Sequence, residues 1–321
     1  MKHFLIYTNC HKDRDLATTR RICNFLQLKG RRTTVMAEER PESAACPGQG
    51  RGGERDESAE PGSGRAPAVS RQRAGDSGRT WEPERVGEVP KDADCMIVLG
   101  GDGTVLQAAR LTKRLHIPMI GVNLGTLGYL TEVEVLNLEE ALERLIAGDY
   151  VQESRMMLNG RVAFAGGGEA EDWALNDIVI SRSGPLQIIR FDIFVNGQFL
   201  NDYSADGMIV TTPTGSTGYN LSAGGPLVEP GARLIMLTPI CPHSLNQRSI
   251  VLSPEDVIEI GIPRPGEGGI QTVEANFDGN HVIPLRTGDR LRIVRSEETA
   301  EFLRLNQVSF LEVLHKKMRD T

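Results

Sequence analysis

Apolar and polar positions alternate in blocks along the first part of the chain. The apolar runs at residues 3–8 and 32–37 predict two buried strands. Between them, residues 16–28 place apolar side chains at helical spacing, and Gly30 follows as a stop signal. A strand, a helix and a second strand in this order predict the start of a parallel sheet.

The same pattern returns after an interruption. Residues 93–99 and 117–123 predict buried strands, and residues 105–115 and 138–147 predict helices. Asn137 and Glu140 have the spacing of an N-cap and its capping-box partner, and Gly148 ends that helix. We therefore expect a parallel, Rossmann-like α/β domain over residues 1–148.

The interruption spans residues 41–90. It carries nine glycines and six prolines but no Ile, Leu or Phe. Such a segment buries too little apolar area to offset the entropy lost on ordering. We expect a disordered insertion, or a sequence error such as a frameshift. An Arg-rich binding arm is the alternative, although nine acidic residues outnumber seven arginines there.

Beyond residue 148 the pattern becomes rich in short β-type runs separated by Gly, Pro, Asn and Asp. They predict strands at 175–181, 188–195, 208–212, 249–252, 257–262 and 291–294. Ser309 and Glu312 are spaced as a capping box for a last helix through Lys317. We expect a mostly-β domain over 149–295, and a C-terminal strand and helix over 296–321 that pack back on the first domain.

Composition narrows the class of protein. The net charge of the 321 residues is −7, so the basic field that gathers nucleic acid or anionic lipid is absent. The five cysteines form no CxxC pair, which argues against a disulfide framework or structural zinc and favours a reducing compartment. No apolar run has the length of a signal peptide or a membrane span. We expect a cytoplasmic protein without a nucleic-acid or membrane partner.

A glycine-rich segment, Gly100-Gly101-Asp102-Gly103-Thr104, lies between a predicted strand and a predicted helix. Glycines let backbone N–H groups approach an anion, and a helix N-terminus adds positive partial charge. A carboxylate suits phosphate poorly there, but it suits a base for an attacking hydroxyl or an anchor for Mg²⁺. A tight turn with Asp102 as N-cap is the alternative. No Walker A sequence competes for this role.

Two polar segments follow in the second half. The loop at 211–220, preceded by Asp206-Gly207, holds five hydroxyl side chains and Tyr219. These groups can bind sugar hydroxyls and phosphates while the ring stacks on a planar group, although such a loop is also an ordinary surface loop. Asn176-Asp177 is either a cap or turn pair or a ribose-binding pair.

In their order along the chain, these segments resemble the NAD kinase family. That family carries GGDGT, N-x-G-x-L-G-F/Y-L, an Asn-Glu/Asp pair and TPTGST-A-Y-N, and residues 121–130 here read GVNLGTLGYL. The resemblance covers about residues 90–320 and, more faintly, 3–37, and includes 242–245 and Asp278-Gly279. Gly218 stands where Ala is usual, and Asp177 where Glu is commonest. GGDGT alone also fits lipid kinases and phosphofructokinases, whereas the TPTGST loop and the Asn-Asp pair narrow the choice.

The resemblance implies transfer of the γ-phosphoryl of ATP, with Mg²⁺ or another divalent cation, to the 2′-hydroxyl of the adenosine ribose of NAD. Asp102 would be catalytic. The donor phosphates would face Gly100, Gly101, Gly103 and Thr104. NAD would be held by Asp102, Gly103, Tyr129, Asn176, Asp177, Asp206, Thr217, Gly218, Tyr219 and Ser222. The resemblance also implies a homodimer or homotetramer, and it assigns no metal ligands and no phosphate-neutralising Lys or Arg.

Two other classes of protein stay open. A lipid kinase of the diacylglycerol type should carry an apolar acceptor groove or a basic membrane face. A non-catalytic NAD(P)-binding sensor should lack the carboxylate that this chain keeps at Asp102.

Overall fold

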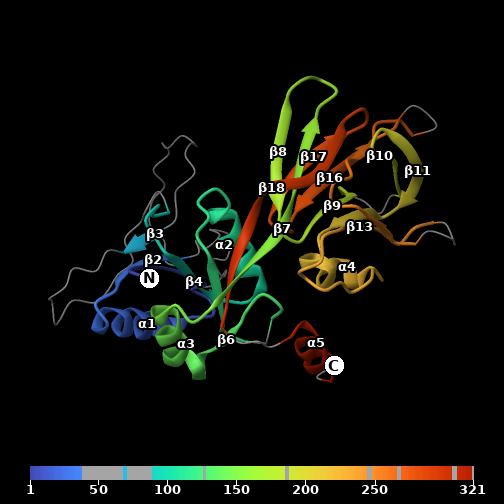
Figure 1. Ribbon diagram of the computed structural model, residues 1–321. Helices are drawn as coiled ribbons and strands as arrows, with labels where there is room; N and C mark the ends of the chain where they lie inside the picture. Colours follow the sequence, from blue (N-terminus) through green and yellow to red (C-terminus); the bar gives the residue numbers. More distant parts are fainter. Residues whose placement is uncertain are drawn as a thin grey trace, which may run out of the picture.

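The computed structural model (Figure 1) describes residues 1–37, 68–70, 89–125, 128–184, 188–243, 248–265, 269–305 and 309–319. An α/β unit at the N-terminal end continues into a larger, mostly-β part (Figure 1). The insertion expected at 41–90 lies outside the described residues except for 68–70 and 89–90. No helix among the described residues has the length and apolar content needed to cross a membrane.

The α/β unit is built on four parallel strands. In sheet order they are β2 (Arg32–Ala37), β1 (His3–Thr8), β4 (Cys95–Gly100) and β5 (Met119–Asn123). The short β3 (Ala68–Ser70) and β6 (Val133–Glu134) pair with β2 and β5. Helices and a turn complete the unit: α1 (Ala17–Leu28) after the 3₁₀ turn Arg14–Leu16, α2 (Asp102–Thr112), and α3 (Leu138–Ala147) after the turn Val135–Asn137.

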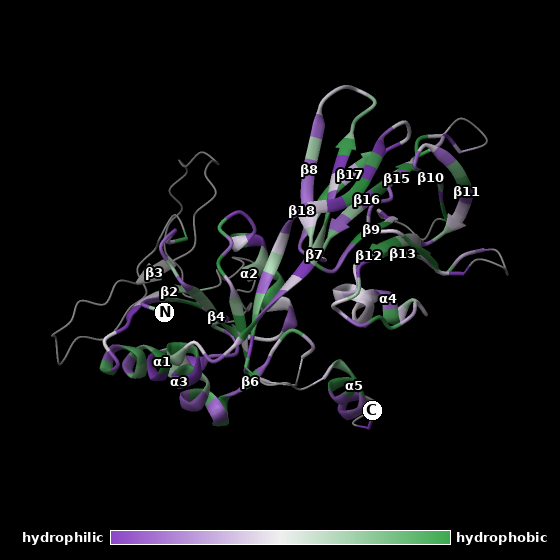
Figure 2. Ribbon diagram, in the orientation of Figure 1, coloured by the Kyte–Doolittle hydropathy of each residue, from purple (hydrophilic) through white to green (hydrophobic). Residues whose placement is uncertain are grey.

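Helices cover both faces of this sheet. Phe4 and Ile6 pack with α1 and α3, whereas Leu5 and Tyr7 point to the other face and pack with α2. Because both faces are buried, these strands read as continuous apolar runs. Helix α1 shows both hydropathy colours in Figure 2, as expected for a helix with one buried face.

Two long strands join the α/β unit to the β part. β7 (Val151–Ala163) and β18 (Arg290–Arg304) form an antiparallel pair that runs from one part into the other (Figure 1). Near its end, β18 lies beside β5, with Phe302 opposite Met119. The resulting 12-stranded sheet also holds β8 (Glu169–Ala174), β10 (Ile189–Val195), β11 (Gln198–Ala205) and β15 (Ile258–Gly261).

A second, antiparallel sheet packs against the first. Its order is β14 (Ile250–Leu252), β13 (Ile235–Ile240), β12 (Gly207–Thr211), β9 (Asp177–Arg182), β16 (Thr272–Phe277) and β17 (His281–Arg286). Leu158 and Phe191 of the first sheet meet Ile180 and Phe277 of the second in one buried core. The helical elements beyond are the turn Thr214–Thr217, α4 (Tyr219–Ser222) and α5 (Phe310–Arg319).

The structure confirms the fold class expected from the sequence, with two corrections. Asn137 precedes α3 but makes no side-chain cap hydrogen bond, so the capping box expected there is absent. The one expected at α5 is formed, because the Ser309 N–H donates to Glu312 and the Glu312 N–H donates to Ser309 Oγ. Secondly, β7, β8, β11, β13, β16 and β17 lie in segments where no strand was predicted. The domain boundaries stay a prediction; the one expected at 295 falls inside β18.

Candidate functional site

The glycine-rich turn joins β4 to α2 at the carboxyl edge of the parallel sheet. Gly101 is the N-cap residue of α2, and Asp102 is its first helical residue. The Asp102 carboxylate accepts the Tyr129 N–H through Oδ2 at 2.8 Å and the Leu130 N–H through Oδ1 at 3.0 Å. The N-cap interpretation of Asp102 is therefore wrong, because its carboxylate holds the loop at 128–130 instead.

The glycines of this region fall into two kinds. A Cβ on Gly100 would lie 2.3 Å from Thr104 Oγ1, and one on Gly128 would lie 1.9 Å from Asp102 Oδ1, so close packing requires both glycines. Gly103 is exposed, and in the described part of the chain no atom beyond the local helix backbone lies within 4 Å of where its Cβ would be. Since glycine disfavours a helix relative to alanine, the fold does not explain Gly103.

Thr104 is used inside the turn. It is buried, its hydroxyl accepts a hydrogen bond from Asn9 Nδ2 at 3.3 Å, and its N–H donates to the Gly101 carbonyl at 3.0 Å. Its side chain therefore braces the turn and does not face solvent. Within the motif, Gly103 is exposed and Asp102 is half-buried, whereas Gly100 and Gly101 are buried like Thr104.

Lys12 is a residue of this site that the sequence did not reveal. Asn9 Oδ1 accepts the N–H groups of His11 and Lys12 at 3.0 and 3.2 Å, which fixes the loop after β1. A Cβ on Gly101 would lie 2.8 Å from Lys12 Nζ, so the exposed ammonium lies over the turn. Because β1 and β4 are adjacent and parallel, the segments that follow them meet at one edge.

Asn176 and Asp177 occupy a turn held by Asp278. The Asp278 carboxylate accepts the N–H groups of Leu175 (2.9 Å), Asn176 (2.8 Å) and Asp177 (3.2 Å). The buried Oδ1 of Asn176 has no hydrogen-bond partner among the described residues. An unpartnered buried oxygen costs about 1–3 kcal/mol, so this atom is suited to a ligand's donor.

Asp177 is buried beside the same carboxylate. Burial, and secondly the negative charge of Asp278, raise the pKa of Asp177 to about 7. The group therefore changes between a hydrogen-bond donor and an acceptor near neutral pH.

Most hydroxyls of the polar loop brace the site and do not face solvent. Thr211 Oγ1 donates to the Asn176 carbonyl at 3.0 Å, Thr212 Oγ1 donates to the Leu175 carbonyl at 2.6 Å, and all three of Thr211, Thr212 and Ser216 are fully buried. The loop expected to offer five hydroxyls to a ligand thus uses most of them internally.

The remaining loop positions are more accessible. Thr217 and Gly218 are half-buried, Ser222 is exposed, and Tyr219 has 48% of its surface exposed. A Cβ on Gly218 would lie 3.6 Å from Asn176 Nδ2, which places this backbone beside the Asn176 side chain. Asp206 stands apart from them in a half-exposed ion pair with Arg182, with an N–O distance of 3.3 Å.

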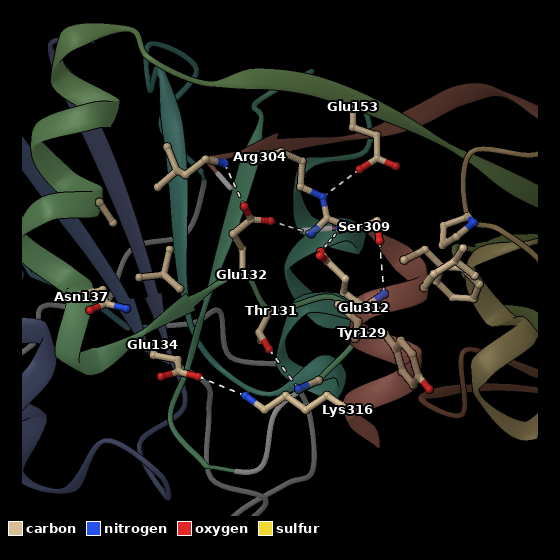
Figure 3. Close-up of a pocket in the computed structure, with 18 of the residues that line it drawn as sticks. Tyr129, Thr131, Glu132, Glu134, Asn137, Glu153, Arg304, Ser309, Glu312 and Lys316 are labelled. Atoms are coloured by element: carbon tan, nitrogen blue, oxygen red, sulfur yellow. Dashed lines mark hydrogen bonds and ion pairs between the residues drawn. The ribbon is translucent and has the colours of Figure 1, made fainter. Parts of the chain in front are cut away.

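A cavity of about 1060 Å³ lies between the α/β unit, the crossing strands and α5 (Figure 3). Gly128 and Tyr129 line it from one part of the chain, and Glu229 and Pro230 from the other. The Tyr129 ring lies 6.4 Å from the Phe310 ring of α5. Burial and the neighbouring charge of Asp102 raise the pKa of Tyr129.

Comparison with known proteins decides the family. Residues 4–150 match the ATP-NAD kinase N-terminal domain, and residues 175–305 match the ATP-NAD kinase C-terminal domain. An NAD kinase of Lachnospira eligens is 43% identical over 327 aligned positions, which cover 99% of this chain and 100% of that protein. One of Agathobacter rectalis is 42% identical over 99% of both chains. The chain belongs to the NAD kinase family.

Two solved structures share the fold. Yeast NADH kinase complexed with NADH has a TM-score of 0.73 at 22% identity, covering 99% of this chain and 88% of that one. An NAD kinase from Archaeoglobus fulgidus in complex with ATP has a TM-score of 0.68 at 24% identity, covering 100% of both chains. Family membership confirms the resemblance seen in the sequence motifs, and with it a phosphotransferase that acts on NAD. The lipid-kinase and sensor alternatives are not favoured.

The described part of the chain offers no ready-made metal cage. No group of three or more His, Cys, Asp or Glu residues in it could hold a metal ion. Mg²⁺ in phosphoryl-transfer enzymes is bound mainly by substrate phosphates and by one or two carboxylates. Of the residues described above, Asp102 at the phosphate-type turn fits that requirement.

Proposed function

We propose that this member of the NAD kinase family joins the 2′-oxygen of the adenosine ribose of NAD to the γ-phosphorus of ATP. The bond between that phosphorus and the β,γ-bridging oxygen breaks, ADP leaves, and the 2′-hydroxyl proton passes to Asp102. The placement of Asp102 carries this proposal. Its carboxylate stands at the N-terminus of α2, held by two amides from the loop that carries Tyr129. Such a group is fixed in orientation, which general base catalysis requires.

The donor phosphates would lie on the glycine-rich turn. Gly101 and Gly103 present backbone at a helix N-terminus, and Lys12 Nζ supplies a positive charge over Gly101. Mg²⁺ bound with ATP would neutralise further charge on the transferring group. Gly100 and Thr104 would act by shaping the turn.

NAD would be held by residues of both parts of the chain. The unpartnered Oδ1 of Asn176 would accept a hydrogen bond from the nucleotide, and Asp177 would bind a ribose hydroxyl. Tyr129 and the exposed Tyr219 offer rings for stacking. The positions that complete this proposed set are Asp102, Gly103, Asp206, Thr217, Gly218 and Ser222.

The assembly and compartment belong to the same proposal. We expect a homodimer or homotetramer in the cytoplasm.

The test gives purified protein ATP, Mg²⁺ and three acceptors: NAD, diacylglycerol and fructose 6-phosphate. With γ-labelled ATP, label should appear in NADP and in neither other product. Polyphosphate replaces ATP in a second series, and NADH replaces NAD in a third, to define donor and acceptor range. Label in lipid or sugar phosphate without NADP would overturn the proposal.

A further inference from the structure

Four charged side chains, those of Glu132, Arg304, Glu153 and Arg155, line the cavity shown in Figure 3, and we call them the ion-pair network. Glu132 Oε2 accepts a hydrogen bond from Arg304 Nη1 at 2.7 Å, and Arg304 Nε donates to Glu153 Oε2 at 2.8 Å. Glu153 Oε1 forms an ion pair with Arg155 Nε at 2.7 Å, although the orientation is not that of a hydrogen bond and this Nε has no hydrogen-bond partner among the described residues. Finally, Arg155 Nη1 donates to Thr214 Oγ1 at 3.4 Å.

One end of the ion-pair network lies beside the loop that holds Asp102. Glu132 follows directly after residues 128–131, and its N–H donates to the Gly121 carbonyl at 2.9 Å. Within that loop the Gly128 N–H donates to Thr131 Oγ1 at 3.2 Å. A displacement of Glu132 therefore moves the backbone that supplies the N–H groups to Asp102.

The other end of the ion-pair network lies in the polar loop at 211–220. Thr214 opens the turn Thr214–Thr217, which leads into Gly218 and Tyr219. A Cβ on Gly215 would lie 2.4 Å from the Asn176 carbonyl oxygen, so this turn packs directly on the Asn176 backbone. The ion-pair network thus connects the Asp102 side of the site with the side proposed to hold NAD.

The two ends of the ion-pair network are more deeply buried than an ion pair on the protein surface. The side chains of Arg155 and Glu132 are 3% and 7% exposed, whereas those of Glu153 and Arg304 are partly exposed, at 28% and 30%. Burial alone would raise the pKa of Glu153, but Arg155 and Arg304 outweigh it and hold this pKa below its usual value. Buried pairs contribute little net stability, because desolvation offsets their attraction, but they require one geometry.

We infer that Glu132, Arg304, Glu153 and Arg155 are positioning residues that set the placement of Asp102 relative to the NAD-binding loop. This inference rests on the proposed function, in which the 2′-hydroxyl must reach Asp102 from a nucleotide held by the other loop. A displacement of about 1 Å between reacting groups can cost about 10²-fold in rate. The four side chains touch neither substrate in this scheme and act through the two loops.

Glu153→Gln tests the inference, because Glu153 is the middle link and contacts neither loop. Amide hydrogen exchange, measured without substrate, should become faster both at Tyr129 and Leu130 and across Thr214–Thr217. The kcat for NADP formation should fall by about 10- to 100-fold, with the KM for ATP changed by less than about threefold. Unchanged exchange in either loop, or more than half of the wild-type kcat, would overturn the inference.

Two further variants keep the result interpretable. Glu134→Gln is the matched control, since Glu134 lines the same cavity and pairs with Lys316 at an exposed site outside the ion-pair network. It should leave exchange and kcat unchanged. If Glu153→Gln does not fold, Thr214→Val decides, because it removes only the last acceptor and should still lower kcat. A wild-type protein that forms no NADP would contradict the proposed function. The hydrogen-exchange data test the coupling between the Asp102 loop and the turn Thr214–Thr217 independently of activity.

Discussion

The backbone of Gly128 lies so close to Asp102 that a Cβ atom there would stand 1.9 Å from the carboxylate Oδ1. This approach lets the next two residues, Tyr129 and Leu130, donate their N–H groups to the same carboxylate. Asp102 is thereby fixed on the side of this loop before any substrate binds. A preorganised carboxylate of this kind loses no orientational freedom at the moment of reaction.

Asp102→Asn should lower kcat by about 10²- to 10⁴-fold, the usual range for a positioned acid or base. The amide removes the base but keeps the size of the side chain. One of the N–H groups of Tyr129 and Leu130 would then face an NH₂ group and lose its acceptor, so a modest fall in melting temperature is also expected. Steady-state NADP formation measures the first effect, and thermal unfolding the second.

The NAD affinity of Asp102→Asn distinguishes a catalytic role of Asp102 from a role in binding NAD. NAD affinity, measured by calorimetry without ATP, should fall far less than kcat. A variant that keeps more than half of the wild-type kcat would remove Asp102 from catalysis and leave it only the role of holding the loop.

Gly103→Ala should separate activity from stability. Among the described residues, no atom outside the surrounding helical backbone lies within 4 Å of the added methyl group, and alanine favours a helix by roughly 0.5–1 kcal/mol, so the melting temperature should stay equal or rise. The methyl group would stand where donor phosphates are proposed to approach, so the KM for ATP should rise at least about tenfold. Kinetics at varied ATP and a thermal melt measure both.

Gly128→Ala is the counterpart of this variant. Its methyl group meets the Asp102 carboxylate, so stability and kcat should fall together. If Gly103→Ala also lost stability and activity in parallel, its glycine would be structural and the phosphate approach at this position would be wrong.

Lys12→Gln should raise the KM for ATP by about tenfold or more while changing the KM for NAD little. The reason is the loss of a positive charge over Gly101, where a charge-assisted hydrogen bond contributes about 1.5–3 kcal/mol. Lys2→Gln, at an exposed position of the same unit, is the control and should behave as wild type. Equal KM values for ATP in wild type and Lys12→Gln would exclude this lysine from the donor site.

The α/β unit could be predicted from the sequence because burial on both faces leaves a strong signal. β1 and β4 are buried at every position, and their residues are almost all apolar. β8 reads Glu-Ala-Glu-Asp-Trp-Ala and is half exposed, so its acidic residues hide a strand whose pairing with β7 is a tertiary contact. Tertiary context overrides local propensity in such strands.

The candidate site shows the same limit in its long-range contacts. The motifs themselves pointed to Asp102 and to Asn176-Asp177. The carboxylate of Asp278, however, binds the Leu175 N–H across 103 positions of sequence. No periodic pattern signals such a contact, or that of Lys12 with the turn at Gly101. A lysine placed just after a strand that neighbours the motif's own strand was the one available hint.

Asp177→Asn should stabilise the substrate-free protein at alkaline pH. The pKa of Asp177 is about 7 in the folded protein, against 3.8 for an ordinary aspartate, so folding takes up a proton between these values. The contribution of a raised pKa is fully present below pH 3.8 and is lost as the pH rises through 7. Asparagine carries no charge, so the variant should be more stable than wild type by on the order of 4 kcal/mol at pH 8.5, but by only on the order of 2 kcal/mol at pH 5.

Denaturant unfolding at pH 5.0 and 8.5 measures this difference, with Asp206→Asn as the control. The Asp206 side chain is 31% exposed and pairs with Arg182, so its substitution removes a carboxylate that is partly in contact with water. The same Asp177→Asn variant should show a higher KM for NAD, because the proposed ribose contact exists in the ground state as well as the transition state. A stability gain that is equal at both pH values would show that burial of the Asp177 charge is not its cause. A stability gain at pH 8.5 together with an unchanged KM for NAD would confirm that the buried Asp177 charge is costly. It would also show that Asp177 does not bind the NAD ribose, so that this contact would not explain the cost.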